Sequence, residues 1–218
     1  GRPDSTAALL PTVTVLDAID DLPAFDWKDP HLIYAGPDEI EQTSQQQGIP
    51  QLEVSSGIAT GSVAAQYSKR PSNSFQERMR VFAGHMTRSV SQHQTSGPSA
   101  TDVEQVVNVA LRPGANYDSW SQPEVNKPAL LGPLQVSIVA IKYFTVLLTD
   151  ASAKGSMIHP AQFRLFVVQE CARAQGVPDW IKFATDGNLK SAYRQIGNAM
   201  LEALAVAIGE SITSARLL

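Results

Sequence analysis

An amphipathic stripe in residues 199–214 limits the folds open to this chain. Its apolar members fall on one side of a helix: Met200, Leu201, Leu204, Ala205, Ile208 and Ile212. A helix with one apolar face buries that face against another element. We therefore expect a partner surface, such as a sheet, and an isolated chain that adheres or self-associates where that surface is missing.

Upstream segments predict both strands and helices. The run at 134–149 is dominated by β-branched and aromatic residues, which indicates two buried or half-buried strands. One helix is expected to end at Gly84, and another, about two turns long, covers 103–111. A third ends at Gly176, because glycine there and Pro178 two residues later form a strong stop signal.

Two further segments are less regular. Residues 12–22 begin with a strand-like Thr/Val alternation and pass into an acidic helical turn that Pro23 ends. Residues 35–66 are rich in Gln, Ser and Gly without a sustained period, which predicts an exposed insert or a long loop. The fold class expected from these patterns is α+β: an irregular region, a few strands and C-terminal helices.

Charge gives no general attraction to a polyanion. The 218 residues carry a net charge of −4, so contact with nucleic acid would have to come from clustered basic residues. The most basic stretch is 69–88, which contains Lys69, Arg70, Arg78, Arg80 and Arg88. Two interpretations stay open: phosphate contacts, or a solvated helix face.

The chemistry-bearing side chains are few. The one cysteine, Cys171, excludes an internal disulfide framework and a Cys-rich zinc site, and we expect it to pack in the core rather than act as a nucleophile. The histidines have no metal-ligand spacing, so we expect surface or capping roles and no metal site. These histidines are His31, His85, His93 and His159.

No targeting or membrane signal is evident. No window approaches about 18 uninterrupted apolar residues, and the start, "GRPDSTAALLPTVTVL", has no apolar signal core. We expect a soluble protein of a reducing compartment, the cytosol or the nucleus. The absence of an initiator methionine also leads us to expect part of a longer protein.

Two motifs near the C-terminus resemble the ninth and tenth motifs of the DNA (cytosine-5) methyltransferases. The ninth-motif segment is "HPAQFRLFVVQECARAQGVPDW", matched at His159, Pro160, Gln162, Arg164, Glu170, Cys171, Ala172, Arg173, Gln175, Gly176, Pro178 and Asp179. The tenth-motif segment is "YRQIGNA", matched at Arg194, Gln195, Gly197, Asn198 and Ala199.

Other segments follow the order seen in the maintenance-type eukaryotic enzymes of this family, especially fungal ones. They are "TVTVLDAIDDLP", "NSFQERMR", the segment around His85, "LRPGANYDSW" and "YFTVLLTDASAKG". The resemblance covers nearly the whole chain and is weakest across 35–66 and 84–106. It implies a nuclear protein and a fragment of the Rossmann-like S-adenosylmethionine-dependent methyltransferase fold.

The resemblance also implies three parts. Residues 1–34 would be a linker from the catalytic core, 35–157 a target-recognition-like region, and 158–218 the region of the last two motifs with its terminal helix. In the family, a cysteine thiolate attacks carbon 6 of a flipped cytosine, and carbon 5 takes a methyl group from S-adenosylmethionine. The Pro-Cys motif of that nucleophile is absent here, so we expect no catalytic residue in this chain and a missing upstream core as its partner.

The resemblance implies cofactor contacts at the tenth motif. Gly197, Asn198, Ala199 and Met200 would line the S-adenosylmethionine pocket of the complete enzyme. A simpler alternative is a helix N-cap, with Asn198 accepting a backbone N–H and Gly197 permitting the bend.

DNA contacts of the complete enzyme are expected at Arg78, Arg80, Arg88 and Arg164. The bases that they would read are not assigned, because recognition loops of the family vary in length and sequence. For the isolated chain, the solvated helix face remains the alternative.

Departures from the family pattern leave the function open. Met200, Leu201 and Glu202 stand where the family usually has Val-Pro-Pro, and Val167 replaces a capping Ser or Thr. Loss of such a cap costs about 0.5–2 kcal/mol. Three hypotheses remain: the C-terminal part of a methyltransferase acting with a core, a diverged non-catalytic remnant or DNA-binding or interaction module, and an unrelated α+β domain.

Overall fold

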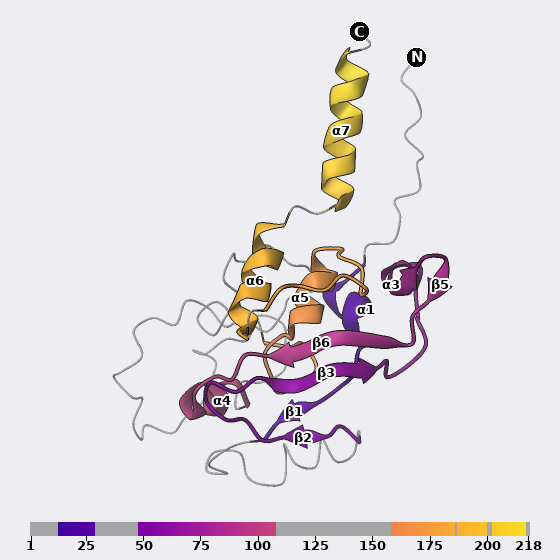
Figure 1. Ribbon diagram of the computed structural model, residues 1–218. Helices are drawn as coiled ribbons and strands as arrows, with labels where there is room; N and C mark the ends of the chain where they lie inside the picture. Colours follow the sequence, from indigo (N-terminus) through magenta and orange to yellow (C-terminus); the bar gives the residue numbers. More distant parts are fainter. Residues whose placement is uncertain (1–12, 29–47, 108–157, 186, 200–201, 217–218) are drawn as a thin grey trace.

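The computed structural model describes residues 13–28, 48–107, 158–185, 187–199 and 202–216 (Figure 1). Within these ranges the chain is a mixed α/β structure of helices and mostly short strands. The two strands predicted at 134–149 lie outside the described residues.

Helix α1 (Val15–Ile19) starts at a reciprocal pair of side-chain caps. The Thr14 hydroxyl accepts the Asp17 N–H at 3.1 Å, and the Asp17 carboxylate accepts the Thr14 N–H at 2.9 Å. Both donors at the helix start are thereby satisfied. The strand expected at the start of 12–22 is wrong for residues 13 and 14, because Thr14 caps the helix instead of pairing in a sheet.

The longest strands pair antiparallel. Strand β3 (Thr60–Gln66) lies beside β6 (Ser89–Thr95), and the register runs from Thr60 opposite Thr95 to Gln66 opposite Ser89. A shorter parallel pair joins β1 (Asp26–Trp27) to β2 (Gln51–Leu52). The long loop expected over 35–66 is therefore wrong for the residues of β2 and β3. Small residues give β3 little local pattern, and its pairing with β6 supplies the backbone hydrogen bonds.

Helix α3 (Ser74–Arg80) ends before the predicted Gly84. The chain continues into a hairpin of β4 (Val81–Phe82) and β5 (His85–Met86). Ala83 at φ 50° and Gly84 at φ 79° occupy the left-handed region that a two-residue hairpin turn requires. Gly84 thus makes the turn of a hairpin and does not stop the helix.

Two helices follow the sequence pattern closely. Helix α4 (Ala100–Val107) starts where the Ser99 hydroxyl accepts the Asp102 N–H at 3.2 Å, and residues 108–111 of the predicted helix lie outside the described residues. Helix α5 (Val168–Ala174) stops just before Gly176, which lies at φ 68°. The predicted stop signal is confirmed, because glycine adopts this conformation without a side-chain clash.

The closing segment differs from the expectation of one helix over roughly 199–214. Tyr193 to Asn198, which precede the expected helix, belong to a helix of their own, α6 (Leu189–Asn198). Ala199 has an extended backbone at φ −74° and ψ 142° and ends that helix. A separate helix, α7 (Glu202–Arg216), follows. The N-cap proposed at Asn198 is therefore wrong, because Asn198 is the last residue of α6.

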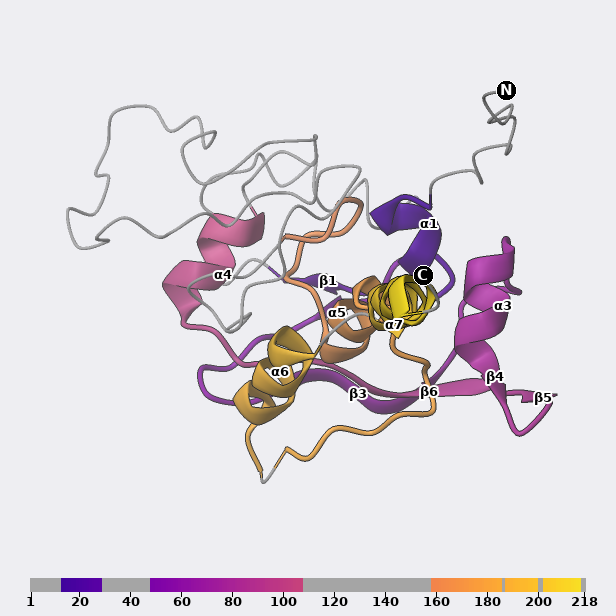
Figure 2. The ribbon, with the colours of Figure 1, turned by 90° about the horizontal axis from the view of Figure 1, so that it is seen from above.

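Helices α1, α5 and α6 share one core with β6 (Figures 1 and 2). Its buried members are Val15, Ala18, Ile19, Leu22, Val90, Phe166, Val168, Cys171, Ala172, Leu189, Ala192, Tyr193 and Ile196. A second core joins α4 and β1 to the segment before α5, through Phe25, Trp27, Val103, Val106, Val107, Ile158, Leu165 and Val167. Segments distant in sequence therefore hold each other in place.

Helix α7 points away from both cores (Figure 1). Ile208 is 44% and Ile212 53% exposed, so two members of the predicted stripe have no covering surface within the described residues. This exposure is the one expected for a helix without its sheet. Self-association of the isolated chain stays a prediction.

Gly61 gives a test of the β3–β6 packing. It lies at φ 108°, and a Cβ there would stand 2.4 Å from the His93 carbonyl oxygen. Gly57 also has a positive φ of 77° but has no atom within 4 Å of the same position. We expect Gly57→Ala to lower the free energy of unfolding by about 1 kcal/mol and Gly61→Ala by a further 1–3 kcal/mol or so. Urea unfolding of both variants measures the difference, and equal losses would contradict the close strand packing.

Candidate functional site

Arg173 of α5 lies at the centre of a buried ionic cluster. Its Nε and Nη2 donate to the two carboxylate oxygens of Asp179 at 2.8 and 2.6 Å, and Nη1 bonds Asp21 and donates to the Ala18 carbonyl at 2.8 Å. Burial disfavours the charged guanidinium, but the hydrogen bonds and charges of Asp179 and Asp21 outweigh it and raise the pKa of Arg173. We call this group, with Arg80 and Tyr67, the Arg173 cluster.

Arg80 and Tyr67 extend the Arg173 cluster to α3 and the end of β3. Arg80 Nε donates to Asp21 at 2.8 Å, and its guanidinium carbon lies 3.5 Å from the centre of the Tyr67 ring. The Tyr67 hydroxyl donates to Asp179 at 2.6 Å. Burial, and then the charge of Asp179, raise the pKa of Tyr67, so the hydroxyl stays protonated and remains a donor.

A second buried cluster surrounds Glu170. Arg164 makes a bidentate pair with the Glu170 carboxylate at 2.8 and 2.6 Å, and its Nε donates to the Phe25 carbonyl at 2.9 Å. His159 Nε2 lies 3.5 Å from the same carboxylate. Burial alone would raise the pKa of Glu170, but Arg164 and then His159 lower it to about 2. We call these three side chains the Glu170 cluster.

Glu170 also replaces part of the missing helix cap. Val167 has no side-chain acceptor, as the sequence indicated, yet its N–H donates to the Glu170 carboxylate at 2.9 Å. The glutamate half of a capping box is therefore present without the hydroxyl half.

Cys171 packs in the core as predicted. The side chain is buried in the core that α5 shares with α1 and α6, and burial, followed by the Glu170 charge, raises the pKa of its thiol. A thiol that resists ionisation and has no access to solvent cannot attack a base. The described residues thus place no activated cysteine at the surface.

The four predicted DNA-contact arginines divide into two pairs. Arg78 on α3 and Arg88 before β6 are exposed, as phosphate contact requires. Arg80 and Arg164 are buried in the clusters described above. Contact with DNA by these two is not supported, because their guanidinium groups are already paired with Asp21 and Glu170. Their charge pattern in the sequence does not reveal those distant partners.

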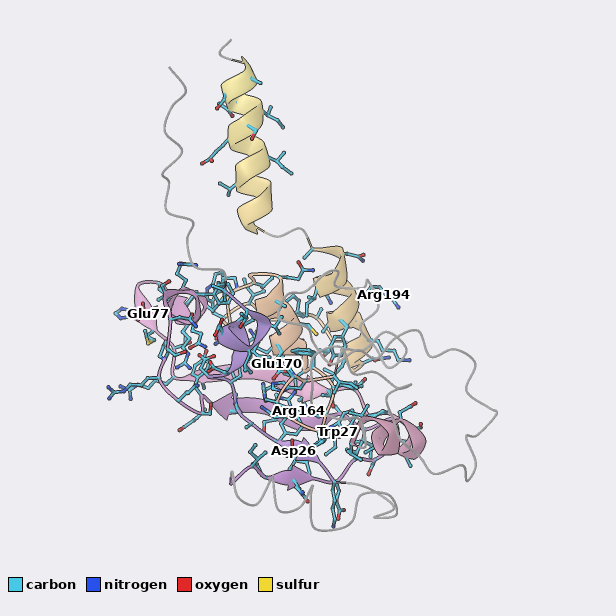
Figure 3. The ribbon with its side chains drawn as sticks, turned by 180° about the vertical axis from the view of Figure 1, so that it is seen from behind. Asp26, Trp27, Glu77, Arg164, Glu170 and Arg194 are labelled. Atoms are coloured by element: carbon cyan, nitrogen blue, oxygen red, sulfur yellow. The ribbon has the colours of Figure 1, made fainter. Side chains whose placement is uncertain are left out.

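The predicted cofactor residues lie at an exposed end of α6. Asn198 and Ala199 are exposed and Gly197 is half-buried, while Met200 lies outside the described residues. Figure 3 shows Arg194 on the outer side of the same helix. These residues offer one edge of a binding site and no enclosure, so the described part of the chain does not by itself fit S-adenosylmethionine.

Two of the histidines differ from the expected surface location. His85 is exposed, but His93 and His159 are buried, and His31 lies outside the described residues. Where the chain is described, no three metal-binding side chains come together. In the same ranges, no helix has the length and apolar character needed to cross a membrane.

One exposed feature escapes the sequence patterns. Phe82, within the helix that was expected to end at Gly84, lies instead on β4 with its ring 5.1 Å from that of Trp180. The sequence held one local sign of the hairpin that exposes Phe82, namely Gly84 two residues later. Trp180 directly follows Asp179, whose side chain is buried in the Arg173 cluster.

Asp179 gives a test of the Arg173 cluster. Asp179→Asn removes a buried charge while keeping the side-chain shape, and we expect the free energy of unfolding to fall by about 3–5 kcal/mol. Glu53→Gln, at an exposed pair with Lys28, should change it by less than about 1 kcal/mol. Chemical denaturation measures both values. Similar small losses would mean that the cluster does not hold the fold.

The buried histidines predict a loss of stability in acid. Burial lowers the pKa of His93 to about 4 although the Glu170 charge opposes it, and burial together with the Arg164 charge lowers the pKa of His159 to about 3, both from the ordinary 6.5. The unfolded chain therefore binds more protons between pH 6.5 and 4, and stability falls as the pH is lowered through that window.

The slope should reach about 1.4 kcal/mol per pH unit for each histidine. Glu170, with a pKa of about 2 against an ordinary 4.5, loses its contribution only below pH 4.5. His93→Gln should reduce the slope between pH 6.5 and 4.5, as measured by urea unfolding at each pH. An unchanged slope in this variant would contradict the neutral, buried state of His93.

Comparison with known proteins identifies relatives of the chain. The family model for C-5 cytosine-specific DNA methylases matches residues 38–214. DNA (cytosine-5)-methyltransferase 4 of Arabidopsis thaliana is 29% identical over 172 residues, covering 69% of this chain and 11% of the relative. DNA (cytosine-5)-methyltransferase 1A of Oryza sativa subsp. japonica is 43% identical over 75 residues, covering 33% of this chain and 5% of the relative.

The mouse relative shows higher identity over a shorter stretch. DNA (cytosine-5)-methyltransferase 1 of Mus musculus is 48% identical over 59 residues, covering 27% of this chain and 4% of the relative. The chain thus spans 4% to 11% of the length of these curated relatives. The family match over residues 38–214 extends through most of the chain, including the Glu170 cluster, and the chain belongs to the C-5 cytosine-specific DNA methylase family.

Proposed function

We propose that this chain is the target-recognition and C-terminal part of a maintenance-type DNA (cytosine-5) methyltransferase, related to the fungal enzymes. The family implies DNA as substrate and methyl transfer to cytosine, with S-adenosylmethionine as the general methyl donor. Residues 1–34 would link to a catalytic core, 35–157 would recognise DNA, and 158–218 would carry the ninth and tenth motifs. The complete enzyme would act in the nucleus.

The main support for this proposal is that the buried charged side chains of the ninth-motif segment are paired. In the ninth-motif segment, Arg164, Glu170, Arg173 and Asp179 each have a charged partner at hydrogen-bond distance. A buried charge that lost its partner would cost several kcal/mol. A decayed remnant accumulates changes without regard to such pairs, so their mutual fit favours a part that is still required to fold.

The covalent step would be performed by another segment. The sequence contains one cysteine, and burial keeps the thiol of Cys171 protonated. This chain would therefore orient DNA and close the enzyme around a cysteine supplied by the core. Exposed Arg78 and Arg88 would contact phosphates, which bind such cations without regard to sequence.

The end of α6 would form one wall of the cofactor site in the complete enzyme. Asn198 and Ala199 are already exposed there, and Gly197 and Met200 adjoin them in sequence. The core would provide the remaining walls. When bound, S-adenosylmethionine would supply the methyl group.

A second candidate function is a non-catalytic DNA-binding or interaction module. The observation that favours it is the exposure of Ile208 and Ile212, one turn apart on α7, which leaves an apolar face for a partner. Under this hypothesis the chain would bind DNA in a salt-sensitive manner and never support methyl transfer.

A chimera distinguishes the two functions. The corresponding C-terminal segment of the mouse DNA (cytosine-5)-methyltransferase 1 would be replaced by this chain, and transfer of a labelled methyl group to DNA would be measured. We expect transfer above that of the mouse enzyme truncated at the junction. Cys171→Ala in the chimera should retain transfer, because this thiol takes no part in the covalent step.

The cooperative thermal unfolding of each chimera controls for folding. A chimera that folds and binds DNA but transfers no methyl group would overturn the enzyme proposal and favour the binding module. Loss of transfer in the folded Cys171→Ala variant would overturn the assignment of the nucleophile to the core.

A further inference from the structure

Two aromatic side chains form an exposed pair at the hairpin. Phe82 is 52% and Trp180 43% exposed, with ring centroids 5.1 Å apart and planes inclined by 43°. Large aromatic side chains bury much of their surface in most folds. We call these two residues the aromatic pair. The exposed ring faces could therefore be covered by a ligand.

The backbone around the aromatic pair is held at several points. Phe82 pairs with His85 across the hairpin, and the Thr87 N–H donates to the Arg80 carbonyl at 2.8 Å. On the other side, the Asp179 N–H donates to the Met79 carbonyl at 2.8 Å. Both rings therefore project from backbone that is anchored next to the Arg173 cluster. Binding of a ligand would thus lose little conformational entropy in this part of the chain.

Exposed cations flank the aromatic pair in sequence. Arg78 lies four residues before Phe82, Arg88 follows the hairpin, and Lys182 lies two residues after Trp180; all three are exposed. Glu77 on α3 is an exposed carboxylate of the same region (Figure 3). The local charge is positive although the chain as a whole carries −4, which favours a polyanion over an apolar protein partner.

We propose that the aromatic pair is a stacking platform for an unpaired base of a single-stranded nucleic acid. Arg78, Arg88 and Lys182 contact the phosphates on either side of that base. Aromatic rings bind bases of any sequence by stacking, and neighbouring cations follow the backbone. The inference rests on the proposed function only for the class of ligand, and it requires no methyl transfer.

The unpaired base distinguishes this surface from simple attraction to DNA. A regular duplex keeps its bases stacked on one another, so it offers phosphates but no free ring face. A single strand, a frayed end or a locally opened site offers both. The platform would thus hold a strand beside the duplex that the enzyme modifies.

Fluorescence anisotropy of the 218-residue chain tests the platform. The probes are a labelled oligothymidine, an abasic oligomer of the same length, and a blunt duplex. We expect the oligothymidine to bind about tenfold more tightly than the abasic oligomer, since stacking of one base is lost. Trp180→Ala should remove that tenfold preference, and Trp180→Phe should restore most of it.

Charge variants separate the phosphate contacts from stacking. Arg88→Gln should lower the salt dependence of binding by about 0.7 in the logarithmic slope for a single strand. Lys190→Gln is the matched control, because Lys190 is exposed on α6, on the opposite side of the molecule from α3 (Figures 1 and 2). This control should bind the oligothymidine as the unchanged chain does.

Three outcomes would overturn the platform. Equal affinity for the oligothymidine and the abasic oligomer would leave only phosphate attraction. Unchanged binding by a folded Trp180→Ala variant would place the base elsewhere. Displacement of the oligothymidine by polyglutamate at equal charge concentration would indicate an acidic partner. A chimera without methyl transfer, by contrast, would leave the platform intact if the oligothymidine preference persisted.

Discussion

The bond between Arg173 and the carboxylates of Asp21 and Asp179 is the constraint on which the rest of the fold depends. Asp21 lies 152 residues before Arg173, so this second carboxylate reaches the guanidinium only when the segment after α1 lies against α5. A guanidinium without these partners would be too costly to bury. Arg80 and Tyr67 bring α3 and the end of β3 to the same carboxylates. Apolar burial supplies the driving force for folding, while this cluster selects which segments meet.

The same cluster connects packing to function. Asp179 is held on its inner side by Arg173 and Gln169, and the next residue, Trp180, is presented to solvent. The buried half of this loop thus fixes the position of the exposed half. In the same way, Arg80 ends α3 in the core, whereas Arg78 of the same helix faces outward. Two arginines within one turn of α3 therefore have different roles, one paired in the core and one exposed to solvent.

Local patterns predicted those features whose cause is local. Gly176 after α5 is one, because a left-handed residue and a following proline stop a helix in any context. Arg80 and Arg164 were predicted to contact DNA, whereas Asp21 pairs with Arg80 across 59 residues and Phe25 accepts from Arg164 across 139. Strand β3 was missed because its pairing with β6, rather than its own period, defines it. Asn198 resembled a cap, yet α6 continues through it, since Tyr193 and Ile196 bury its inner face.

As we propose it, this chain recognises DNA and leaves the covalent step to a cysteine in another segment. The most direct measurement uses DNA with 5-fluorocytosine, whose fluorine blocks release of the attacking thiolate, together with the methyl-donor cofactor and the chimeric enzyme. Peptide mass spectrometry then locates the trapped base. We predict an adduct on a cysteine outside these 218 residues and an unmodified Cys171. An adduct on Cys171 would contradict the proposed division between recognition and chemistry.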